Sequence, residues 1–287
     1  TMPHVRSITH IDRIPCDVVQ QIIKKAFRYR TQQCTQKLQN KIIGNLTNRT
    51  LLTTDYARDT LFLSGASFQT AIYKANCLSV SGPSGKFTSE TIETMEQYCD
   101  AIVLHNPQYI DTEKVSKWTD KPIVDGGGPT QALVCYMTIC DYFTIPQQLT
   151  VTFCGDLNNC LVSRSLIRLL DKMVDKLTLY LISPEENRLE EGFVRSTKQV
   201  CVVGDDLSSV MPTTDVLFMA NSEADLKEPE STFEMAKPEC IVLQPCPRIE
   251  TEAFIVPQNK YFEQIQNGVY LRMAILGYCL GLKKAWI

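Results

Sequence analysis

Cysteine and histidine are the side chains of this sequence that most often bind metals or act as nucleophiles. Twelve cysteines are spread from Cys16 to Cys279 without a C-x-x-C pair, and only three histidines accompany them. Metal sites and disulfide frameworks are usually built from more closely spaced residues of these types. We therefore interpret the cysteines as free buried thiols, and we expect no metal ion and no cofactor.

The elements that must position any functional group alternate between strand and helix. In the first half, apolar runs predict strands at 50–55, 77–81, 101–104 and 122–125, and helical periodicity predicts helices at 16–37, 67–74, 89–99 and 111–118. The loop GGGPT at 126–130 leads from the last of these strands into a further helix. Such alternation is typical of a parallel sheet with flanking helices.

A second set of elements follows the segment TIPQQ at 144–148. It comprises strands at 149–153, 177–182, 199–203, 216–219 and 240–243, a helix at 161–172 and a long apolar helix at 261–282. We expect this last helix to pack back on the first domain. The sequence therefore predicts an α/β fold with two βα domains, one at 1–143 that is completed by residues 261–287, and one at 149–260.

Composition and charge describe a globular protein without a surface that attracts polyanions. Apolar residues make up 44% of the 287 residues, charged residues 21%, and the formal net charge is −3. No net positive field is available to gather nucleic acid or an anionic membrane. The most apolar stretch near an end, 270–281, is too short to span roughly 30 Å of hydrocarbon. We expect small metabolites or other proteins as partners, with no nucleic acid and no membrane span.

The free thiols favour an intracellular, reducing compartment. The first residues lack the charged and then apolar pattern of a secretion signal. We expect the cytoplasm rather than an organelle, and a removed targeting leader stays an open alternative.

Four segments carry a family resemblance when they are read in order. They are YCDAIVLHNPQ at 98–108, PIVDGGGPTQAL at 122–133, VTFCGDL at 151–157 with SL at 165–166, and QPCPR at 244–248 with QNGVYLRMA at 266–274. The first is similar to Y-A-D-V-V-V-L-R-H-P-Q, and the second to P-V-I-N-A-G-D-G followed by H-P-T-Q-A-L. With these motifs the chain resembles the aspartate carbamoyltransferases, specifically their animal multifunctional-enzyme branch.

The resemblance implies the two-domain fold of the aspartate and ornithine carbamoyltransferases, with a carbamoyl-phosphate-type domain first and an aspartate-type domain second. Members of the family make N-carbamoyl-L-aspartate and phosphate from carbamoyl phosphate and L-aspartate, in pyrimidine biosynthesis, without a metal or a covalent intermediate. Such catalysis is positioning plus electrostatics. The phosphate and carboxylates must be met by Arg, Lys, His and helix N-termini. The family's catalytic units are cyclic trimers, formed largely through the first domain.

On the carbamoyl-phosphate side, the resemblance implies that most of the family's basic groups are lost. The family's phosphate loop reads S-T-R-T at a helix start, and the aligned residues here are Asp59, Thr60, Leu61 and Phe62. Only Thr60 is retained, and a carboxylate stands where a phosphate would bind.

The next segments are altered as well. The family's K-G-E-S loop crosses from a neighbouring subunit, and here it is shorter, with Ser84 at the Lys position and Lys86 as a candidate substitute. His105 replaces the Arg of V-L-R-H-P-Q, and this loss is partial because histidine can still donate a hydrogen bond. Gly128 replaces the His of H-P-T-Q, whereas Gln131 is retained.

On the aspartate side, Leu161 takes the position of the Arg that grips the α-carboxylate in the family. In the family's T-R-x-Q loop, the Arg and Gln positions are occupied here by Asn221 and Glu223. Arg164 and Arg248 are candidate substitutes for the missing cations.

One segment that shapes the family's site with backbone carbonyls is retained. It consists of Pro245, Cys246 and Pro247. Because the same segment also turns the chain at the domain junction, its retention does not separate a role in binding from a role in folding.

Three hypotheses remain open. The first is a catalytically inactive homologue with a structural or regulatory role, as a homotrimer or as a hetero-oligomer with an active relative or a larger complex. The second is a diverged but active aspartate carbamoyltransferase in which Lys86, His105, Arg164 and Arg248 rebuild an anion site. The third is a module that binds another small metabolite, such as an amino acid, in the altered cleft.

Overall fold

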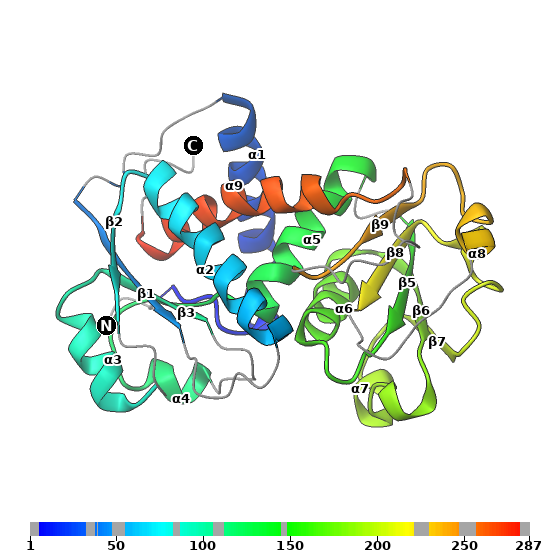
Figure 1. Ribbon diagram of the computed structural model, residues 1–287, viewed down its shortest axis with the longest axis horizontal. Coiled ribbons are helices and arrows are strands. Elements are labelled where there is room, and N and C mark those ends of the chain that lie inside the picture. Colours follow the sequence, from blue (N-terminus) through cyan, green and yellow to red (C-terminus); the bar gives the residue numbers. More distant parts are fainter. Residues whose placement is uncertain are drawn as a thin grey trace. The chain divides into compact units, whose positions relative to one another are not determined.

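The computed structural model describes residues 6–32, 38, 40–47, 55–82, 87–105, 112–144, 148–220, 230–246 and 257–281. The chain divides into two compact units, Thr1–Val134 with Gln266–Ile287 and Cys135–Ile265. Each unit holds one parallel β-sheet with helices packed against it, which confirms the predicted α/β fold (Figure 1). The division falls inside helices α5 (Gly128–Tyr142) and α9 (Tyr261–Cys279). The predicted boundaries lie elsewhere, at residue 143 just after the end of α5 and at residue 261 where α9 begins. These boundaries stay a proposal.

The sheet of the first unit has four parallel strands in the order β2-β1-β3-β4. The strands are β1 (Ile42–Thr47), β2 (Leu78–Ser81), β3 (Ala101–His105) and β4 (Ile123–Asp125). The strand order changes direction between β1 and β3, and their pairing aligns Thr47 with His105. Open α/β sheets bind ligands beyond the carboxyl ends of their strands at such a switch point. The sequence candidates near residues 105 and 128 therefore lie at the expected edge of this sheet.

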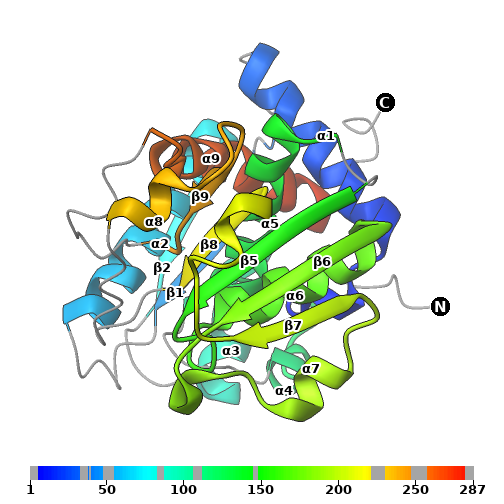
Figure 2. The ribbon, with the colours of Figure 1, turned by 90° about the vertical axis from the view of Figure 1, so that its right-hand side faces the viewer.

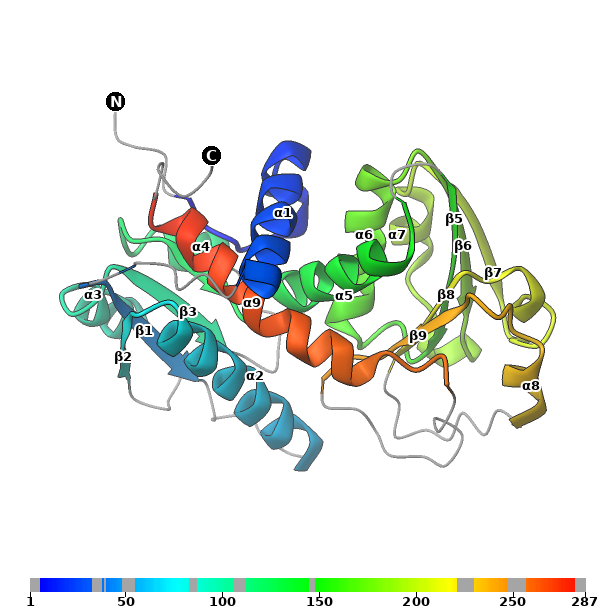
Figure 3. The same ribbon diagram turned by 90° about the horizontal axis from the view of Figure 1, so that it is seen from above.

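Helices lie on both sides of this sheet. They are η1 (Ile11–Arg13), α1 (Cys16–Gln32), α2 (Asp55–Lys74), α3 (Ser89–Glu96), α4 (Thr112–Ser116) and parts of α5 and α9. Because the crossovers from β1 to β2 and from β2 to β3 run in opposite directions, right-handed connections place α2 and α3 on opposite faces (Figure 3). In α1 the buried residues Val19, Ile22, Ile23 and Ala26 recur at helical spacing, which gives this helix one apolar face.

The sheet of the second unit has five parallel strands in the order β7-β6-β5-β8-β9 (Figure 2). The strands are β5 (Gln148–Gly155), β6 (Lys176–Ile182), β7 (Val200–Gly204), β8 (Val216–Ala220) and β9 (Ile241–Leu243). The interior strand β8 is buried throughout, as expected where helices or loops cover both faces of a parallel sheet. The switch point of this sheet lies between β5 and β8, where Gly155 is aligned with Ala220.

The helices of the second unit are α6 (Leu161–Met173), η2 (Glu185–Asn187), α7 (Glu191–Arg195), η3 (Met211–Thr213), α8 (Glu230–Glu234) and the remaining parts of α5 and α9. Helix α6 buries Leu166, Leu169, Leu170 and Met173 along one face. Among the described residues of the whole chain, no helix combines the length and the apolar character that a membrane crossing requires.

One helix prediction in the first unit is wrong, because α2 begins at Asp55 rather than at residue 67. The structure also has a strand that the sequence did not predict, β1 at Ile42–Thr47, whereas residues 50–54 of the strand predicted at 50–55 lie outside the described residues. The sequence pattern did not indicate β1 because Gly44 and Asn45 belong to residue types that are disfavoured in strands. Gly44 is explained by packing, since a Cβ there would lie only 3.0 Å from Cys99 Sγ. The other predicted strands and long helices agree with the structure to within a few residues, apart from segments outside the described part.

The eleven cysteines of the described segments carry free thiols. Burial raises the pKa of Cys77 and of Cys279 to about 12, so these thiols stay protonated and unreactive at neutral pH. The described Cys, His, Asp and Glu side chains form no group of three that could hold a metal ion.

Candidate functional site

The carboxyl end of β3 carries His105, which the sequence resemblance places at an Arg position. Its side chain is 1% exposed. The ring Nδ1 lies 2.9 Å from Ser64 Oγ of α2, and Nε2 lies 2.6 Å from Asn45 Oδ1 of β1. The Ser64 hydroxyl also donates to the Gly126 carbonyl oxygen at 3.0 Å. Both ring nitrogens therefore have partners within the first unit.

The proton on the His105 ring can be placed in two ways. A neutral imidazole has one donor and one acceptor. With the proton on Nε2, the ring donates to Asn45 Oδ1, and Nδ1 competes with the Gly126 carbonyl for the single Ser64 proton. With the proton on Nδ1, the ring donates to Ser64 Oγ, Ser64 donates to Gly126, and the Asn45 amide turns its NH₂ group toward Nε2. In either tautomer the ring N–H is used inside the protein.

Burial also keeps His105 uncharged. Desolvation and, to a smaller extent, the positive charge of Arg272 lower the pKa of His105 from 6.5 to about 3. The ring of Phe68 meets the imidazole edge-on at a centroid distance of 5.4 Å. A Cβ on Gly126 would lie 2.5 Å from His105 Nδ1, so only glycine leaves room for the ring at this close approach. These contacts favour a role in the core of the first unit over a role in anion binding.

Helix α5 starts at the position where the sequence resemblance implies a lost histidine. Gly128 is its first residue and contributes no side chain. The Thr130 hydroxyl donates to the Asp125 carbonyl oxygen, and the Gln131 N–H donates to the Gly127 carbonyl oxygen at 2.9 Å. Asp125 accepts a hydrogen bond from the Gly127 N–H at 2.7 Å, and burial raises its pKa to about 6 despite that bond. The retained residues thus form the local structure of the helix start.

The phosphate-loop positions lie inside α2 rather than at its start. Helix α2 begins at Asp55, and Asp59, Thr60, Leu61 and Phe62 follow one turn later. Only the first four N–H groups of an α-helix lack an acceptor within the helix. The amides of residues 59–62 are therefore bonded within α2, and a phosphate would not find the free amides of a helix start there. The side chains of these four residues lie outside the described part.

Six further candidates lie outside the described residues altogether, namely Ser84, Lys86, Asn221, Glu223, Pro247 and Arg248. The roles that the resemblance implies for these six residues stay predictions.

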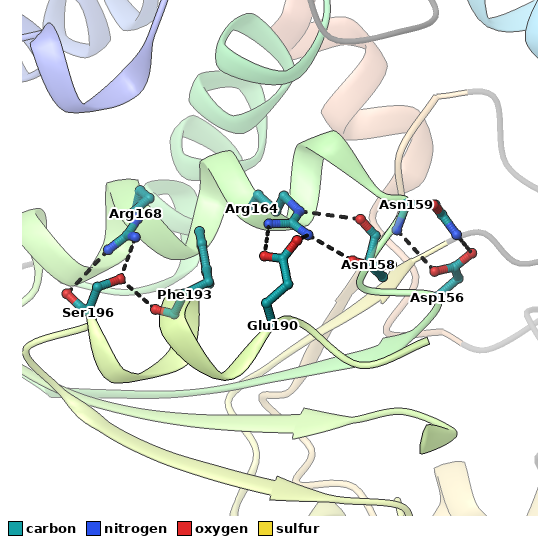
Figure 4. A network of polar contacts seen from close by, with 8 residues as sticks. All are labelled: Asp156, Asn158, Asn159, Arg164, Arg168, Glu190, Phe193 and Ser196. Carbon is teal, nitrogen blue, oxygen red and sulfur yellow. Dashed lines mark hydrogen bonds and ion pairs between the residues drawn. The ribbon is translucent and has the colours of Figure 1, made fainter. Parts of the chain in front are cut away.

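In the second unit, Leu161 is the first residue of α6. Arg164 lies in the same turn (Figure 4). Arg164 forms a two-pronged ion pair with Glu190, with Nη1 2.9 Å from Oε2 and Nη2 3.1 Å from Oε1. It also donates to Asn158, from Nη2 to Oδ1 at 2.8 Å and from Nε to the carbonyl oxygen at 3.3 Å. The hydrogen bonds and charge of Arg164 lower the pKa of Glu190. All three guanidinium nitrogens of Arg164 are thus engaged within the second unit.

Arg168 extends this network along α6 (Figure 4). The guanidinium carbons of Arg164 and Arg168 lie 5.4 and 4.2 Å from the centroid of the Phe193 ring. Arg168 also donates to the Ser196 carbonyl oxygen at 3.3 Å and to its hydroxyl oxygen at 2.5 Å. Cation–π contacts and hydrogen bonds of this kind hold α7 against α6. The network therefore stabilises the crossover that precedes β7.

The retained segment after β9 is held by a glutamine pair. Gln264 Nε2 donates to the Gln244 carbonyl oxygen at 2.6 Å, and the Gln244 N–H lies 3.4 Å from Gln264 Oε1. The Tyr261 hydroxyl lies 3.6 Å from Cys246 Sγ. Pro245 and Cys246 are both buried. These contacts hold the described part of the segment against the start of α9.

Sequence reasoning did not single out Asn45, Ser64, Arg272 or Glu190, although these residues decide what His105 and Arg164 can do. The partners of His105 lie 60 and 41 residues away along the chain, and Glu190 lies 26 residues from Arg164. A local motif cannot reveal such pairs. The one available signal was a histidine at the end of an apolar strand, which predicts a buried ring that needs two polar partners.

Comparisons with known proteins agree on one family. The family model described as "Aspartate/ornithine carbamoyltransferase, carbamoyl-P binding domain" matches residues 6–141. The aspartate carbamoyltransferase catalytic subunit of Alkaliphilus oremlandii is 31% identical over 223 residues, covering 69% of this chain and 67% of that protein. The multifunctional protein CAD of Squalus acanthias is 28% identical over 222 residues, and the chain spans only 10% of its length. The similarity thus includes an animal multifunctional protein.

A solved structure shows the same fold. An aspartate transcarbamoylase from Trypanosoma cruzi, crystallised with carbamoyl aspartate and phosphate, superimposes with a TM-score of 0.81. It is 23% identical, and the match covers 96% of this chain and 97% of that one. The Trypanosoma cruzi enzyme has also been crystallised with N-(phosphonacetyl)-L-aspartic acid. The fold likeness confirms the two parallel-sheet α/β plan that the sequence resemblance implied.

Proposed function

The chain belongs to the aspartate carbamoyltransferase family, and we propose that within this family it is a catalytically inactive member with a structural or regulatory role in an oligomer. The observation that carries the proposal concerns the two described residues that could replace lost basic groups. Both already bind partners within the protein. His105 is neutral and hydrogen-bonded inside the first unit. Arg164 is paired with Glu190 and Asn158 inside the second unit.

The charge that the family's reaction requires supports the same conclusion. The substrates bring a phosphate and two carboxylates, and buried anions need paired cations or hydrogen-bond donors. At the described family positions this chain offers Gly128 and Leu161, which carry no donor in their side chains. The placement of residues 59–62 inside α2 adds to this, because the helix-start amides of the phosphate loop are used within the helix.

We expect N-(phosphonacetyl)-L-aspartic acid not to bind this chain at micromolar concentrations. The analogue carries a phosphonate and two carboxylates, and the proposed site lacks the cations that would offset the cost of desolvating them. Isothermal calorimetry measures this directly, with the Trypanosoma cruzi enzyme that was crystallised with the same compound as the positive control. A micromolar dissociation constant would overturn the inactive assignment in favour of a diverged but active transferase. Binding of a free amino acid other than aspartate, but not of the analogue, would instead point to a module for another metabolite.

The oligomer in this proposal is a trimer built through the first unit, either of this chain alone or mixed with an active relative. Support comes from the preservation of that unit, because residues 98–108 and 122–133 carry the clearest resemblance and the family model matches residues 6–141. An interface can outlive the chemistry of a nearby site, since a ring of subunits closes whenever the rotation between neighbours is kept.

Light scattering on the purified chain is expected to give a mass that is a multiple of three chains. Native mass spectrometry of a mixture with an active relative from the same cell tests the mixed trimer. A strict monomer in both experiments would remove the support for a structural role.

A further inference from the structure

The outer edge of β7 is open among the described residues of the second unit. β7 ends the sheet, and among the strands of the described residues it pairs with β6 alone. The Gly204 carbonyl oxygen accepts a hydrogen bond from the Ser183 N–H on the β6 side. Backbone groups alternate sides along a strand, so Val200, Val202 and Gly204 face β6, whereas the N–H and C=O groups of Cys201 and Val203 face outward. A strand from another molecule would find these outward groups unpaired.

The side chains of β7 are also unusually apolar for an exposed edge. Val200 is 62% exposed, and Val202 and Val203 are each 45% exposed. Edge strands normally carry a Lys, a Pro or a bulge that blocks pairing with another chain. The run from Val200 to Gly204 has none of these, since it contains no charge and no proline. This composition is typical of a strand that pairs with another strand rather than of a protected edge strand.

The charges that flank β7 select the partner. Exposed Lys198 precedes the strand, and exposed Asp205 and Asp206 follow it. Hydrogen bonds from Ser208 lower the pKa of Asp206, so its carboxylate is ionised at neutral pH. A strand that is basic at one end and acidic at the other is complementary to its own antiparallel copy. It would place like charges together in a parallel copy.

We propose that β7 pairs antiparallel with β7 of a second copy of this chain, which joins the two second units into one continuous sheet. A two-fold axis perpendicular to the sheet makes each face of one strand continuous with the same face of the other strand. Even-numbered residues can therefore lie opposite only even-numbered residues, and odd-numbered residues opposite only odd-numbered ones. The register centred on Val202 sets Cys201 opposite Val203 as hydrogen-bonded pairs and brings Lys198 to the acidic end of the other copy. Val202 then faces Val202 across the axis. This interface lies outside the proposed trimer contact, and it does not depend on the loss of activity.

Molar mass tests the pairing through the substitution Val202→Lys. Two lysines facing each other across the axis repel, whereas a lysine on a half-exposed edge is compatible with the folded monomer. Light scattering is expected to show that the parent assembly has twice the molar mass of the Val202→Lys assembly. This ratio holds whether the variant is a monomer or a trimer. The matched control is Met235→Lys, which changes a 48% exposed apolar residue in the same unit away from β7. Circular dichroism and thermal unfolding of both variants verify that they are folded.

A parent mass that Val202→Lys leaves unchanged would overturn the pairing, and so would an equal drop in Met235→Lys. Failure of the trimer proposal is a separate outcome, because it removes the factor of three and leaves the factor of two.

A cysteine at the axis tests the register. Opposite residues in a non-hydrogen-bonded antiparallel pair have Cα atoms about 4.5 Å apart, which lies within the range for disulfides. Val202→Cys is expected to form a covalent dimer under mild oxidation, faster than the parent and faster than Met235→Cys. Equal rates of dimer formation in the two cysteine variants would contradict the proposed contact.

Discussion

Supplied with carbamoyl phosphate and L-aspartate, the purified chain is expected to form N-carbamoyl-L-aspartate at least a thousandfold more slowly than a typical enzyme with a kcat of roughly 10 s⁻¹. The reaction depends on donors that meet charge as it develops on phosphate and carbonyl oxygens. The sequence resemblance implies that four positions which supply such donors in the family are Leu61, His105, Gly128 and Leu161 here. Three of them have no polar side-chain atom, and the fourth uses its ring N–H inside the first unit.

The size of the expected loss follows from the cost of single donors. Removing one preorganised donor typically costs about 3 kcal/mol, and such costs do not add fully when donors act as a unit. At half strength, four positions give about 6 kcal/mol, or a rate lower by roughly ten-thousandfold. This margin is large enough to survive partial replacement of one cation by Lys86 or Arg248.

A coupled or radiometric assay for carbamoyl-aspartate measures the rate, with the Trypanosoma cruzi enzyme assayed under the same conditions to show that the method detects product. The variant His105→Gln gives a matched control, because a catalytic His105 would make its rate fall while a structural one leaves the residual rate unchanged. Turnover within a thousandfold of roughly 10 s⁻¹ would mean that other residues rebuild the site and that the chain is an active transferase.

The parts of the fold that could be predicted are those where local pattern and final environment agree. Buried strands such as β3 and β8 contain apolar runs, and α6 shows one apolar face, so their positions followed from the sequence pattern. Strand β1 was not predicted, because its residues Gly44 and Asn45 serve contacts with residues that are distant in the sequence. Gly44 makes room for Cys99, and Asn45 binds the ring of His105. Tertiary contacts overrode propensity at both positions.

The chemistry of the candidate residues was less predictable than their positions. The sequence could place His105 at a strand end and Arg164 near a helix start, as the structure confirms. Whether either side chain was available to a ligand depended on Ser64, Asn45 and Glu190, which come from other elements. An Arg with a bidentate carboxylate partner and an Arg that awaits a substrate look the same in one sequence. The difference lies in distances that only the folded chain sets.

The pH dependence of stability is the second large effect, and it is expected to change sharply when Asp125 is replaced. His105 has a folded-state pKa of about 3 against an ordinary value of 6.5. Between these values the unfolded chain binds a proton that the folded chain does not, so acidification from pH 6.5 toward pH 3 destabilises the fold. At pH 5 this amounts to about 2 kcal/mol relative to pH 7.

Asp125 acts in the opposite direction. Burial raises its folded-state pKa from 3.8 to about 6. Between these values the folded chain binds a proton that the unfolded chain does not, so acidification from pH 6 toward pH 3.8 stabilises the fold. The gain at pH 5 is about 1 kcal/mol relative to pH 7. In the parent, the two groups therefore largely offset each other from pH 7 down to about pH 4.

Asp125→Asn removes the stabilising contribution and keeps the acceptor for the Gly127 N–H. We expect this variant to lose about 1 kcal/mol more than the parent between pH 7 and pH 5. It should be more stable than the parent at pH 7, because no carboxylate must then be ionised while partly buried. His105→Gln removes the destabilising contribution, so its free energy of unfolding should fall less than that of the parent over the same interval. Urea unfolding at each pH measures the free energies, and differences from the parent cancel the contribution of shared pairs such as Lys41 with Asp100. If all three proteins showed the same change between pH 7 and pH 5, His105 would not be a buried neutral ring, and the structural role assigned to it here would fail with that result.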